Sequence, residues 1–335
     1  MTSLDPTFVP PIIDIAPLQS GDAAALAGVA AQLLEPCEEL GMFHIVGHGL
    51  TRDACQEFES AMHALFALPD EEKAMFERSA ENAWGYYNKE LTKNRPDWKE
   101  IFDYGREHPG AASGERPPHS DGFNRWPDGQ PEIKRALLAH HKSCSRIARD
   151  LLRALSVGLG LAPDRLDCYF AEDSSFTRLN HYPFCPDPAE SDADFFPSQG
   201  RLGVHHHSDA GGLTLLYQDS VAGLQALVGD RFVAIEPVDD ALTVNLGDML
   251  QIFSNDRFRS PVHRVLARSD RERYSAPFFF NPRYDALCEP IVPTTAREMR
   301  PRFKPVSWAH FRGERAAGDF ADYGTEIQVD DFRID

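Results

Sequence analysis

The chain has 335 residues, of which 42% are hydrophobic and 26% are charged, close to the composition of an ordinary globular protein. Its 52 acidic residues outnumber its 34 basic residues and give a formal net charge of −18. Nucleic acids and anionic membranes attract basic surfaces, so this balance argues against both as broad partners. A small anion in a local basic pocket is not excluded.

Targeting signals and cysteine usage favour a cytoplasmic protein. No stretch approaches the roughly 20 apolar residues that a transmembrane helix needs. Residues 1–18 lack the basic and apolar regions of a signal peptide. The cysteines are scattered without CxxC spacing, which in a chain of this length indicates reduced thiols. They are Cys37, Cys55, Cys144, Cys168, Cys185 and Cys288.

The first third of the chain combines helices with short strands. The apolar run over residues 9–15 carries two prolines and suits an edge strand. Apolar residues then repeat at helical spacing over residues 26–40. Pro36 lies inside this pattern and is expected to kink the helix or end it early. A strand over residues 42–46 and a second amphipathic helix over residues 55–65 are predicted next.

The remainder of the chain changes from a long helix to a series of strands. Residues 105–131 are rich in turn-forming residues and are predicted to form loops. A long helix is predicted to begin at Pro131 and to stop at Gly158 and Gly160. Beyond about residue 172, short apolar-alternating runs predict a β-sandwich or barrel. These runs are Phe176–Tyr182, Gly203–Asp209, Leu213–Tyr217, Gly223–Leu227, Arg231–Ile235, Leu242–Leu246, Met249–Phe253, Val262–Leu266 and Tyr274–Phe280.

No Gly/Ser-rich or charged linker divides the helical part from the β-rich part. We therefore expect residues 1–335 to form a single structural domain of mixed α+β class with a mainly β core. The long helix would cover one face of the sheet, because a sheet buries its apolar face against another layer.

The segment Gly203-Val-His-His-His-Ser-Asp209 carries a candidate metal site. Because side chains alternate between the faces of a strand, His207 and Asp209 are expected to project to the same side. His263 lies on another predicted strand and can supply a third ligand. Two histidines and one carboxylate leave coordination positions open, as in the facial triad of non-haem Fe(II) oxygenases. Zinc accepts the same ligands, and a His-rich tripeptide is also common in solvated loops.

The neighbouring histidines leave an ambiguity about the ligand. Strand phase places His205 on the same face as His207 and Asp209, whereas His206 should point away. We favour His207 because it is only two residues from Asp209. A β-bulge would change this phase.

Two further pairs of residues suit a bound acid. Arg273 and Ser275 share a strand face, and they face the metal side if their strand is adjacent to that of His263. A guanidinium fork beside a hydroxyl group is well suited to a carboxylate. Asn180 and Tyr182 could hydrogen-bond the metal-proximal end of such an acid. Each of these four residues also has an ordinary structural explanation when it is considered alone.

An ordered set of segments, nearly from end to end, resembles the isopenicillin N synthase-like family of Fe(II)/2-oxoglutarate-dependent oxygenases. The resemblance marks residues 9–125 as the family's N-terminal region and residues 172–285 as its oxygenase core. The segments are Pro11-Ile-Ile-Asp-Ile, Gly41-Met-Phe-His-Ile-Val-Gly-His-Gly, Phe66-Ala-Leu-Pro-Asp-Glu-Glu-Lys73, Asp97-Trp-Lys-Glu-Ile-Phe-Asp, Asn124-Arg-Trp-Pro-Asp, Asn180-His-Tyr-Pro, His207-Ser-Asp209, Gly223-Leu-Gln, Asn245-Leu-Gly-Asp248, Ser254-Asn, His263-Arg-Val, Arg273-Tyr-Ser275 and Phe278-Phe-Phe-Asn-Pro282.

The resemblance implies a distorted double-stranded β-helix, or jelly roll, with an N-terminal helical region and a long supporting helix. It implies that His207, Asp209 and His263 bind Fe(II) and act in catalysis. It also implies that Arg273 and Ser275 bind the distal carboxylate of 2-oxoglutarate.

The resemblance extends to the reaction. Asn180 and Tyr182 would lie near the iron-binding end of 2-oxoglutarate. The implied enzyme uses O₂, converts 2-oxoglutarate to succinate and hydroxylates, desaturates or cyclises a small organic substrate, and ascorbate could serve as a reductant. Phe279 is a candidate wall of the substrate pocket, because an unbroken strand would place it on the face of Arg273 and Ser275. A core aromatic is the alternative for Phe279.

Three other functions stay open. An oxidase of the same fold can keep the Arg/Ser pair without using 2-oxoglutarate, as the isopenicillin N synthase and aminocyclopropanecarboxylate oxidase types do. A zinc hydrolase could use the same triad, but it needs a general base beside the metal, and none is evident. A non-catalytic binding module should have lost a ligand, and none is missing.

The prime substrate is not identified by the variable stretches over residues 84–126 and 184–200. Trp84, Tyr86, Tyr87 and Arg95 could reach a pocket, but the sequence does not place them. We expect a monomer that binds a small-molecule substrate and has no nucleic-acid or membrane partner.

Overall fold

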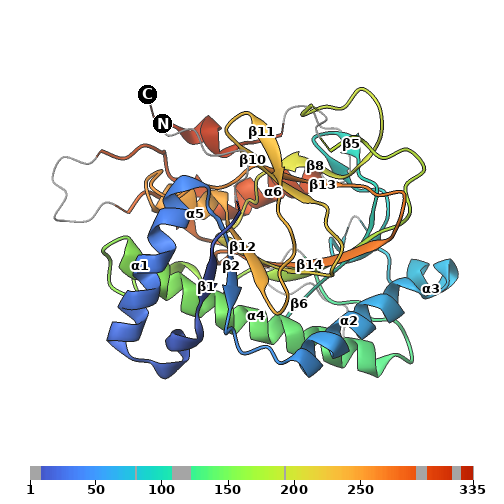
Figure 1. Cartoon of the computed structure of the whole chain (residues 1–335), viewed down its shortest axis with the longest axis horizontal. Coiled ribbons are helices and arrows are strands. Elements are labelled where there is room, and N and C mark those ends of the chain that lie inside the picture. Colours follow the sequence, from blue (N-terminus) through green and yellow to red (C-terminus); the bar gives the residue numbers. More distant parts are fainter. Residues whose placement is uncertain are drawn as a thin grey trace.

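The computed structural model describes residues 9–79, 81–107, 122–191, 194–291, 300–318 and 326–334. Two β-sheets form the centre of this part of the chain, and three helices from the first half of the chain gather on one side of them (Figure 1). The mainly β core with a helical cover confirms the predicted fold class. No helix among the described residues is both long enough and apolar enough to cross a bilayer. All six cysteines are free thiols.

The larger sheet has eight strands in the order β1-β2-β12-β9-β14-β7-β6-β3. They are β1 (Ile12–Asp14), β2 (Met42–Val46), β3 (Gly85–Tyr87), β6 (Glu100–Gly105), β7 (Phe176–Tyr182), β9 (Leu213–Gln218), β12 (Leu242–Leu246) and β14 (Arg273–Phe280). The smaller sheet has the order β11-β10-β13-β8 and contains β8 (Leu202–His207), β10 (Leu224–Val228), β11 (Arg231–Ala234) and β13 (His263–Leu266). Two short hairpins pair β4 (Leu91–Thr92) with β5 (Arg95–Pro96) and β15 (Leu287–Cys288) with β16 (Val306–Ser307).

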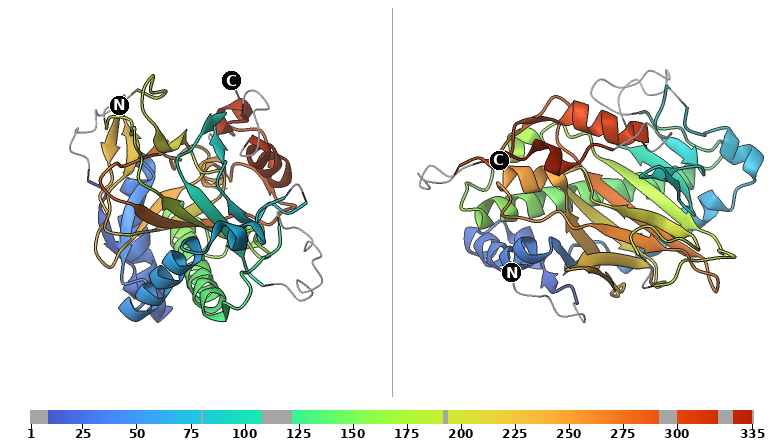
Figure 2. Two further views of the ribbon diagram at one scale, coloured as in Figure 1. Left: turned by 90° about the vertical axis from the view of Figure 1, so that its right-hand side faces the viewer. Right: turned by 90° about the horizontal axis from the view of Figure 1, so that it is seen from above.

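Three helices cover the face of the larger sheet that is turned away from the smaller one, whereas α6 (Trp308–Gly318) lies on the side of the smaller sheet. The long α4 (Pro131–Gly158) lies along this face beside α1 (Ala23–Glu39) and α2 (Arg52–Phe66), as Figures 1 and 2 show. Apolar side chains of α1, α4, β12 and β14 share one core, which removes a large apolar surface from water. The shorter helices are α3 (Asp70–Ala74), α5 (Asp248–Phe253) and α6 (Trp308–Gly318).

Two predictions about the elements are wrong, and one of the two outcomes expected at Pro36 is not seen. The run Met249–Phe253 is helical and belongs to α5; all of its residues are buried, so it lacks the periodicity that separates a strand from a helix. Pro36 does not end α1 early, because the helix continues to Glu39. The resemblance places the segment that begins at Asp97 in the family's N-terminal helical region, but from Glu100 onward this segment belongs to β6, which pairs with β7. The remaining predicted strands are present with boundaries shifted by two residues at most, except at the proline-containing first strand, which shortens to β1.

Candidate metal centre and adjoining pockets

The three predicted ligands converge where β8 and β13 meet. His207 is the last residue of β8 and lies opposite His263, the first residue of β13, while Asp209 follows two residues later in the chain. Oδ1 of Asp209 is 3.6 Å from Nε2 of His207 and 3.7 Å from Nε2 of His263. One ligand atom from each residue lies within 4.8 Å of the other two. These distances allow all three atoms to coordinate a single metal ion.

Backbone carbonyls orient the two imidazole rings. Nδ1 of His207 is 2.8 Å from the carbonyl oxygen of His205, and Nδ1 of His263 is 3.1 Å from that of Pro261. Because a carbonyl oxygen only accepts, each Nδ1 donates its proton. In the neutral ring Nε2 then carries the lone pair, and it faces the space next to Oδ1 of Asp209, where a metal would lie. Burial, with a smaller effect of His207, lowers the pKa of His263 to about 4. His263 is therefore neutral at pH 7, the form that binds a metal.

Two side chains without a role in the sequence-based predictions form hydrogen bonds with the carboxylate of Asp209, at the oxygen that faces away from the two histidines. Oδ2 of Asp209 accepts hydrogen bonds from Oγ1 of Thr214 at 2.5 Å and from Nδ2 of Asn245 at 2.8 Å. Thr214 on β9 and Asn245 on β12 are direct partners in the sheet register. Burial alone would raise the pKa of Asp209, but His263 and His207 hold it well below its usual range. The carboxylate stays ionised and leaves Oδ1 for a metal.

A β-bulge resolves the ambiguity among the histidines. The β8–β13 register pairs His263 with His207 and Val265 with Val204, so β8 has one extra residue between these pairs. As a result Val204 and His207 both line the cavity at the triad, whereas His205 contacts Asp97, with Nδ1 and Oδ1 3.1 Å apart. The expectation that His205 shares the face of His207 is wrong for this reason.

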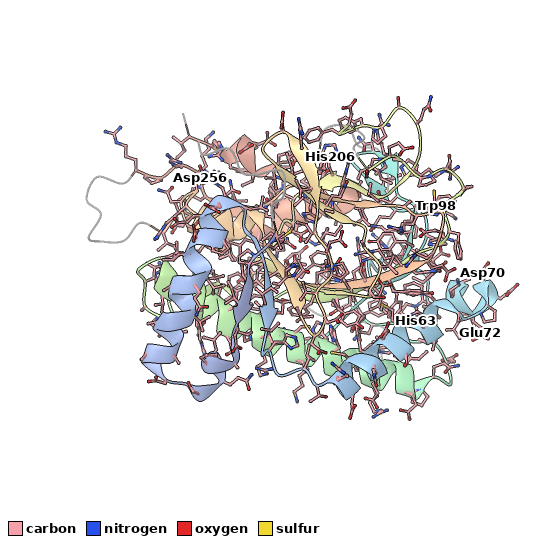
Figure 3. The ribbon with its side chains drawn as sticks, viewed as in Figure 1. His63, Asp70, Glu72, Trp98, His206 and Asp256 are labelled. Atoms are coloured by element: carbon pink, nitrogen blue, oxygen red, sulfur yellow. The ribbon has the colours of Figure 1, made fainter. Side chains whose placement is uncertain are left out.

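His206 points away from the triad, as predicted. Its Nδ1 is 3.1 Å from the carbonyl oxygen of Phe195, and its ring contacts Phe195 and Phe196. Figure 3 labels it on the smaller sheet, which lies across the larger sheet from the long helix α4.

Arg273 and Ser275 lie on β14 and line the same cavity as the triad. Arg273 is only 1% exposed, and its guanidinium donates to Oγ of Ser275 at 3.2 Å, to Oε1 of Gln218 at 2.8 Å and to the carbonyl of Val221 at 3.1 Å. No carboxylate in the described part of the chain forms an ion pair with it. Burying a charge without a counterion is costly, so this position suits an anionic ligand.

Asn180 and Tyr182 complete this end of the cavity. In the β7–β14 register Asn180 is opposite Ser275, and Tyr182 is opposite Arg273, whose guanidinium carbon lies 5.0 Å from the tyrosine ring centre. Oδ1 of Asn180 is buried and has no hydrogen-bond partner among the described residues. An amide oxygen only accepts, so such an atom indicates that a hydrogen-bond donor belongs in the cavity. The cavity, counted together with its opening to solvent, spans about 540 Å³ of space free of protein atoms. Its apolar lining includes Leu216, Leu224, Val265 and Pro277.

A second pocket of about 730 Å³ opens beside the first and also contacts His207 and Asp209; we call it the outer pocket. Phe279 lines both pockets and lies on the same face of β14 as Arg273 and Ser275, as predicted. The outer pocket is otherwise lined mainly by the β4–β5 hairpin, β7 and α6.

Two charged residues that line both pockets, Lys99 and Arg178, have no counterpart among the predicted site residues. The alternation rule could have found Arg178, because it lies two residues before Asn180 on the same strand. They belong to a buried network of three cations (Arg78, Lys99 and Arg178) and three carboxylates (Glu90, Asp97 and Asp103).

Glu90 is central to this network. Its oxygens lie 3.0 Å from a nitrogen of Arg78, 2.9 Å from one of Arg178 and 2.8 Å from Nζ of Lys99. Burial alone would raise the pKa of Glu90, but these three cations hold it well below its usual range. The three cations and three carboxylates of the network neutralise one another.

The four aromatic and basic residues that the sequence left unplaced lie outside both pockets. Tyr86 and Arg95 line a separate surface pocket, in which Trp98, labelled in Figure 3, also lies. Trp84 packs against Phe176, and Tyr87 lies under the guanidinium of Arg78. Part of that variable stretch, residues 108–121, is outside the described residues.

Comparison with known proteins matches two families. Residues 174–282 match the 2OG-Fe(II) oxygenase superfamily, and residues 10–129 match the N-terminal region of non-haem dioxygenases, described as "non-haem dioxygenase in morphine synthesis N-terminal". The 2-oxoglutarate-Fe(II) type oxidoreductase hxnY of Emericella nidulans is 31% identical over 314 residues, covering 89% of this chain and 86% of that protein. Jasmonate-induced oxygenase 4 of Arabidopsis thaliana is 33% identical over 282 residues, covering 82% and 74%.

Solved structures share the fold over nearly the whole chain. JOX2 in complex with 2OG, Fe and JA superposes with a TM-score of 0.79 at 28% identity, covering all of this chain and 92% of JOX2. Neurospora crassa T7H in complex with alpha-KG and thymine gives a TM-score of 0.78 at 25% identity, covering 95% and 99%. These matches confirm the expected jelly roll. The protein is therefore a member of the 2OG-Fe(II) oxygenase superfamily.

Proposed function

We propose that this protein uses Fe(II) and O₂ to couple the decarboxylation of 2-oxoglutarate to the oxidation of a small organic substrate by hydroxylation, desaturation or cyclisation. One observation carries this proposal: the three candidate ligands line the same cavity as Arg273, a buried cation without a carboxylate partner in the described residues. A metal at one end and a cation at the other match a dicarboxylate that chelates through its keto-acid end.

The residues at the two ends of the cavity would bind different groups. His207, Asp209 and His263 would hold Fe(II), which supplies O₂ activation when it is bound. Arg273 and Ser275 would fix the distal carboxylate by charge-assisted hydrogen bonds.

At the iron-binding end of the co-substrate, Nδ2 of Asn180 and the hydroxyl group of Tyr182 would donate hydrogen bonds to the keto acid. Phe279, at the junction of the two pockets, would form a wall of the substrate site. Holding the substrate C–H bond close to the metal and keeping water out are the contributions that the protein itself makes.

The alternatives have less support. An oxidase that does not use 2-oxoglutarate would need some other anion beside the buried Arg273. A zinc hydrolase needs a general base, yet the carboxylates of the outer pocket other than Asp209 are already paired: Glu90 with three cations and Glu326 with Arg315 at 2.6 Å.

Anaerobic titration with Fe(II) and 2-oxoglutarate tests this function. We expect the visible charge-transfer band of the Fe(II)–2-oxoglutarate chelate, and succinate formation once O₂ and a substrate are added. His207→Ala should abolish both signals, whereas His310→Ala, an exposed histidine on α6, should keep both. A wild-type protein that binds Fe(II) but gives no band with 2-oxoglutarate would contradict the proposal, and a substrate that turns over with 2-oxoglutarate omitted would favour the oxidase.

We also infer a single-domain, monomeric, cytoplasmic enzyme for which ascorbate can serve as a reductant. The shared core of helices and strands from both ends of the chain supports the single domain over residues 1–335. The same core supports joining the N-terminal region over residues 9–125 to the oxygenase core over residues 172–285. Six free thiols support the reducing compartment. Gel filtration and fractionation of the cell test these points.

A further inference from the structure

The outer pocket is basic although the chain as a whole is strongly acidic. It lies directly beside His207 and Asp209, where a substrate must be placed for oxidation at the metal. Five cationic side chains line it: Lys93, Lys99, Arg178, Arg312 and Arg315. A local field of this sign cannot come from the net charge of −18, so it reflects the placement of these particular residues.

Most of this positive charge already has a carboxylate partner. Lys99 and Arg178 belong to the neutralised network around Glu90. Nε of Arg315 is 2.6 Å from Oε1 of Glu326, and Nη1 is 3.9 Å from Oδ2 of Asp248. Arg312 lies over the ring of Phe176, with its guanidinium carbon 5.1 Å from the ring centre.

Lys93 differs from these residues. Its ammonium group forms no ion pair with any carboxylate in the part of the chain that the structure describes, although the side chain is half-buried in the pocket wall. Burial lowers its pKa, and Glu326, the nearby acid that opposes this effect most, is bonded to Arg315. A half-buried ammonium that lacks a bonded counterion loses hydration that the distant acids do not replace, so an anion bound beside it would be favourable.

The backbone at Lys93 supports the same interpretation. Lys93 and Asn94 form the two-residue turn between β4 and β5, with φ angles of 50° and 60°. Both residues adopt the left-handed backbone conformation. In two-residue hairpin turns these positions are usually occupied by Asn, Asp or Gly. A lysine in a strained turn beside a binding pocket is a pattern expected of a functional position.

We propose that Lys93 binds an anionic group of the prime substrate, so that the substrates of this protein are small organic anions. The proposal rests on the function proposed above and adds the substrate class to it. Fe(II), Asp209, the 2-oxoglutarate dianion and Arg273 together carry no net charge. The bound metal centre therefore would not repel a substrate anion, and Lys93 would decide between charged and neutral molecules of the same shape.

The wild-type protein tests this preference without any mutation. Fe(II) and 2-oxoglutarate are bound anaerobically, and the chelate band is then monitored while aromatic, indolic and aliphatic carboxylates, the matched sulfonates and the matched primary amides are added. We expect acids to shift the band and to stimulate succinate release under O₂. Amides of the same shape should need at least tenfold higher concentrations for the same response. Sulfonates show whether any anion suffices or a carboxylate is required.

Variants assign the preference to Lys93. Lys93→Gln should reduce the preference for acids over amides at least tenfold, and Lys93→Arg should retain most of it. Lys89→Gln, an exposed lysine in the same segment, is the matched control and should behave as wild type.

Equal responses to acids and amides, no response to any acid, or an unchanged preference in Lys93→Gln would each overturn the proposal. A chelate band that forms normally in those experiments shows that the proposed function still holds. Absence of the band in the wild-type protein would instead count against the proposed function.

Discussion

The hydrogen bonds behind Asp209 lead to a test of how the metal centre is built. Oδ2 of Asp209 is fixed by Asn245 and Thr214, so Oδ1 is turned toward the two histidines. Asn245→Leu removes one donor and keeps a side chain of similar size in a buried position of β12. Thr214→Val removes the other donor with almost no change of shape.

The magnitude follows from the strength of these bonds. A hydrogen bond to a charged group contributes about 1.5–3 kcal/mol, and loss of a partner that orients a metal ligand typically lowers metal affinity about 10–100-fold. That loss corresponds to about 1.4–2.7 kcal/mol of binding free energy. Each single substitution leaves the other donor in place, so the double variant should lose more affinity than either single variant.

Anaerobic Fe(II) titration at saturating 2-oxoglutarate measures this affinity through the chelate band. Thr214→Ser keeps the hydroxyl group and should bind Fe(II) nearly as wild type does. Circular dichroism melts report whether each variant is folded. Unchanged Fe(II) affinity in folded Asn245→Leu and Thr214→Val proteins would refute the argument that these bonds position Asp209.

Other predictions concern the co-substrate, acid stability and the backbone. Arg273→Lys loses the planar fork and should raise the KM for 2-oxoglutarate about 10–100-fold in succinate-release assays. Burial lowers the pKa of His140 to about 3, below the value of about 6.5 in an unfolded chain. The free energy of unfolding therefore decreases as the pH falls below 6.5, and the loss from this group is on the order of 2 kcal/mol at pH 5. His140→Leu should weaken the pH dependence of urea unfolding. Gly41→Ala should destabilise the protein by more than Gly129→Ala in the same assay. Both glycines have positive φ, but a Cβ at Gly41 would lie 1.9 Å from the carbonyl oxygen of Arg259, whereas Gly129 has open space; equal losses would show that this clash is relieved at no cost.

Local patterns in the sequence were enough for most of the core and for the proposed ligand set. The period-two alternation of β14 placed Arg273, Ser275 and Phe279 on one face, because neighbouring side chains of a regular strand must point to opposite sides. The long apolar stripe after Pro131 predicted α4 in the same way. These features depend on residues that are near one another in the chain.

Features that depend on how distant segments meet were decided only by the tertiary structure. The bulge in β8 arises from its pairing with β13, in which β8 has one extra residue. It places the side chains of His205 and His207 in different surroundings. The same holds for Asn245 behind Asp209, and for Lys93, whose hairpin lies beside the triad although 114 residues separate it from His207. Alternation, propensity and charge are local properties of a sequence, whereas register and the absence of a counterion are set by the neighbours that folding supplies.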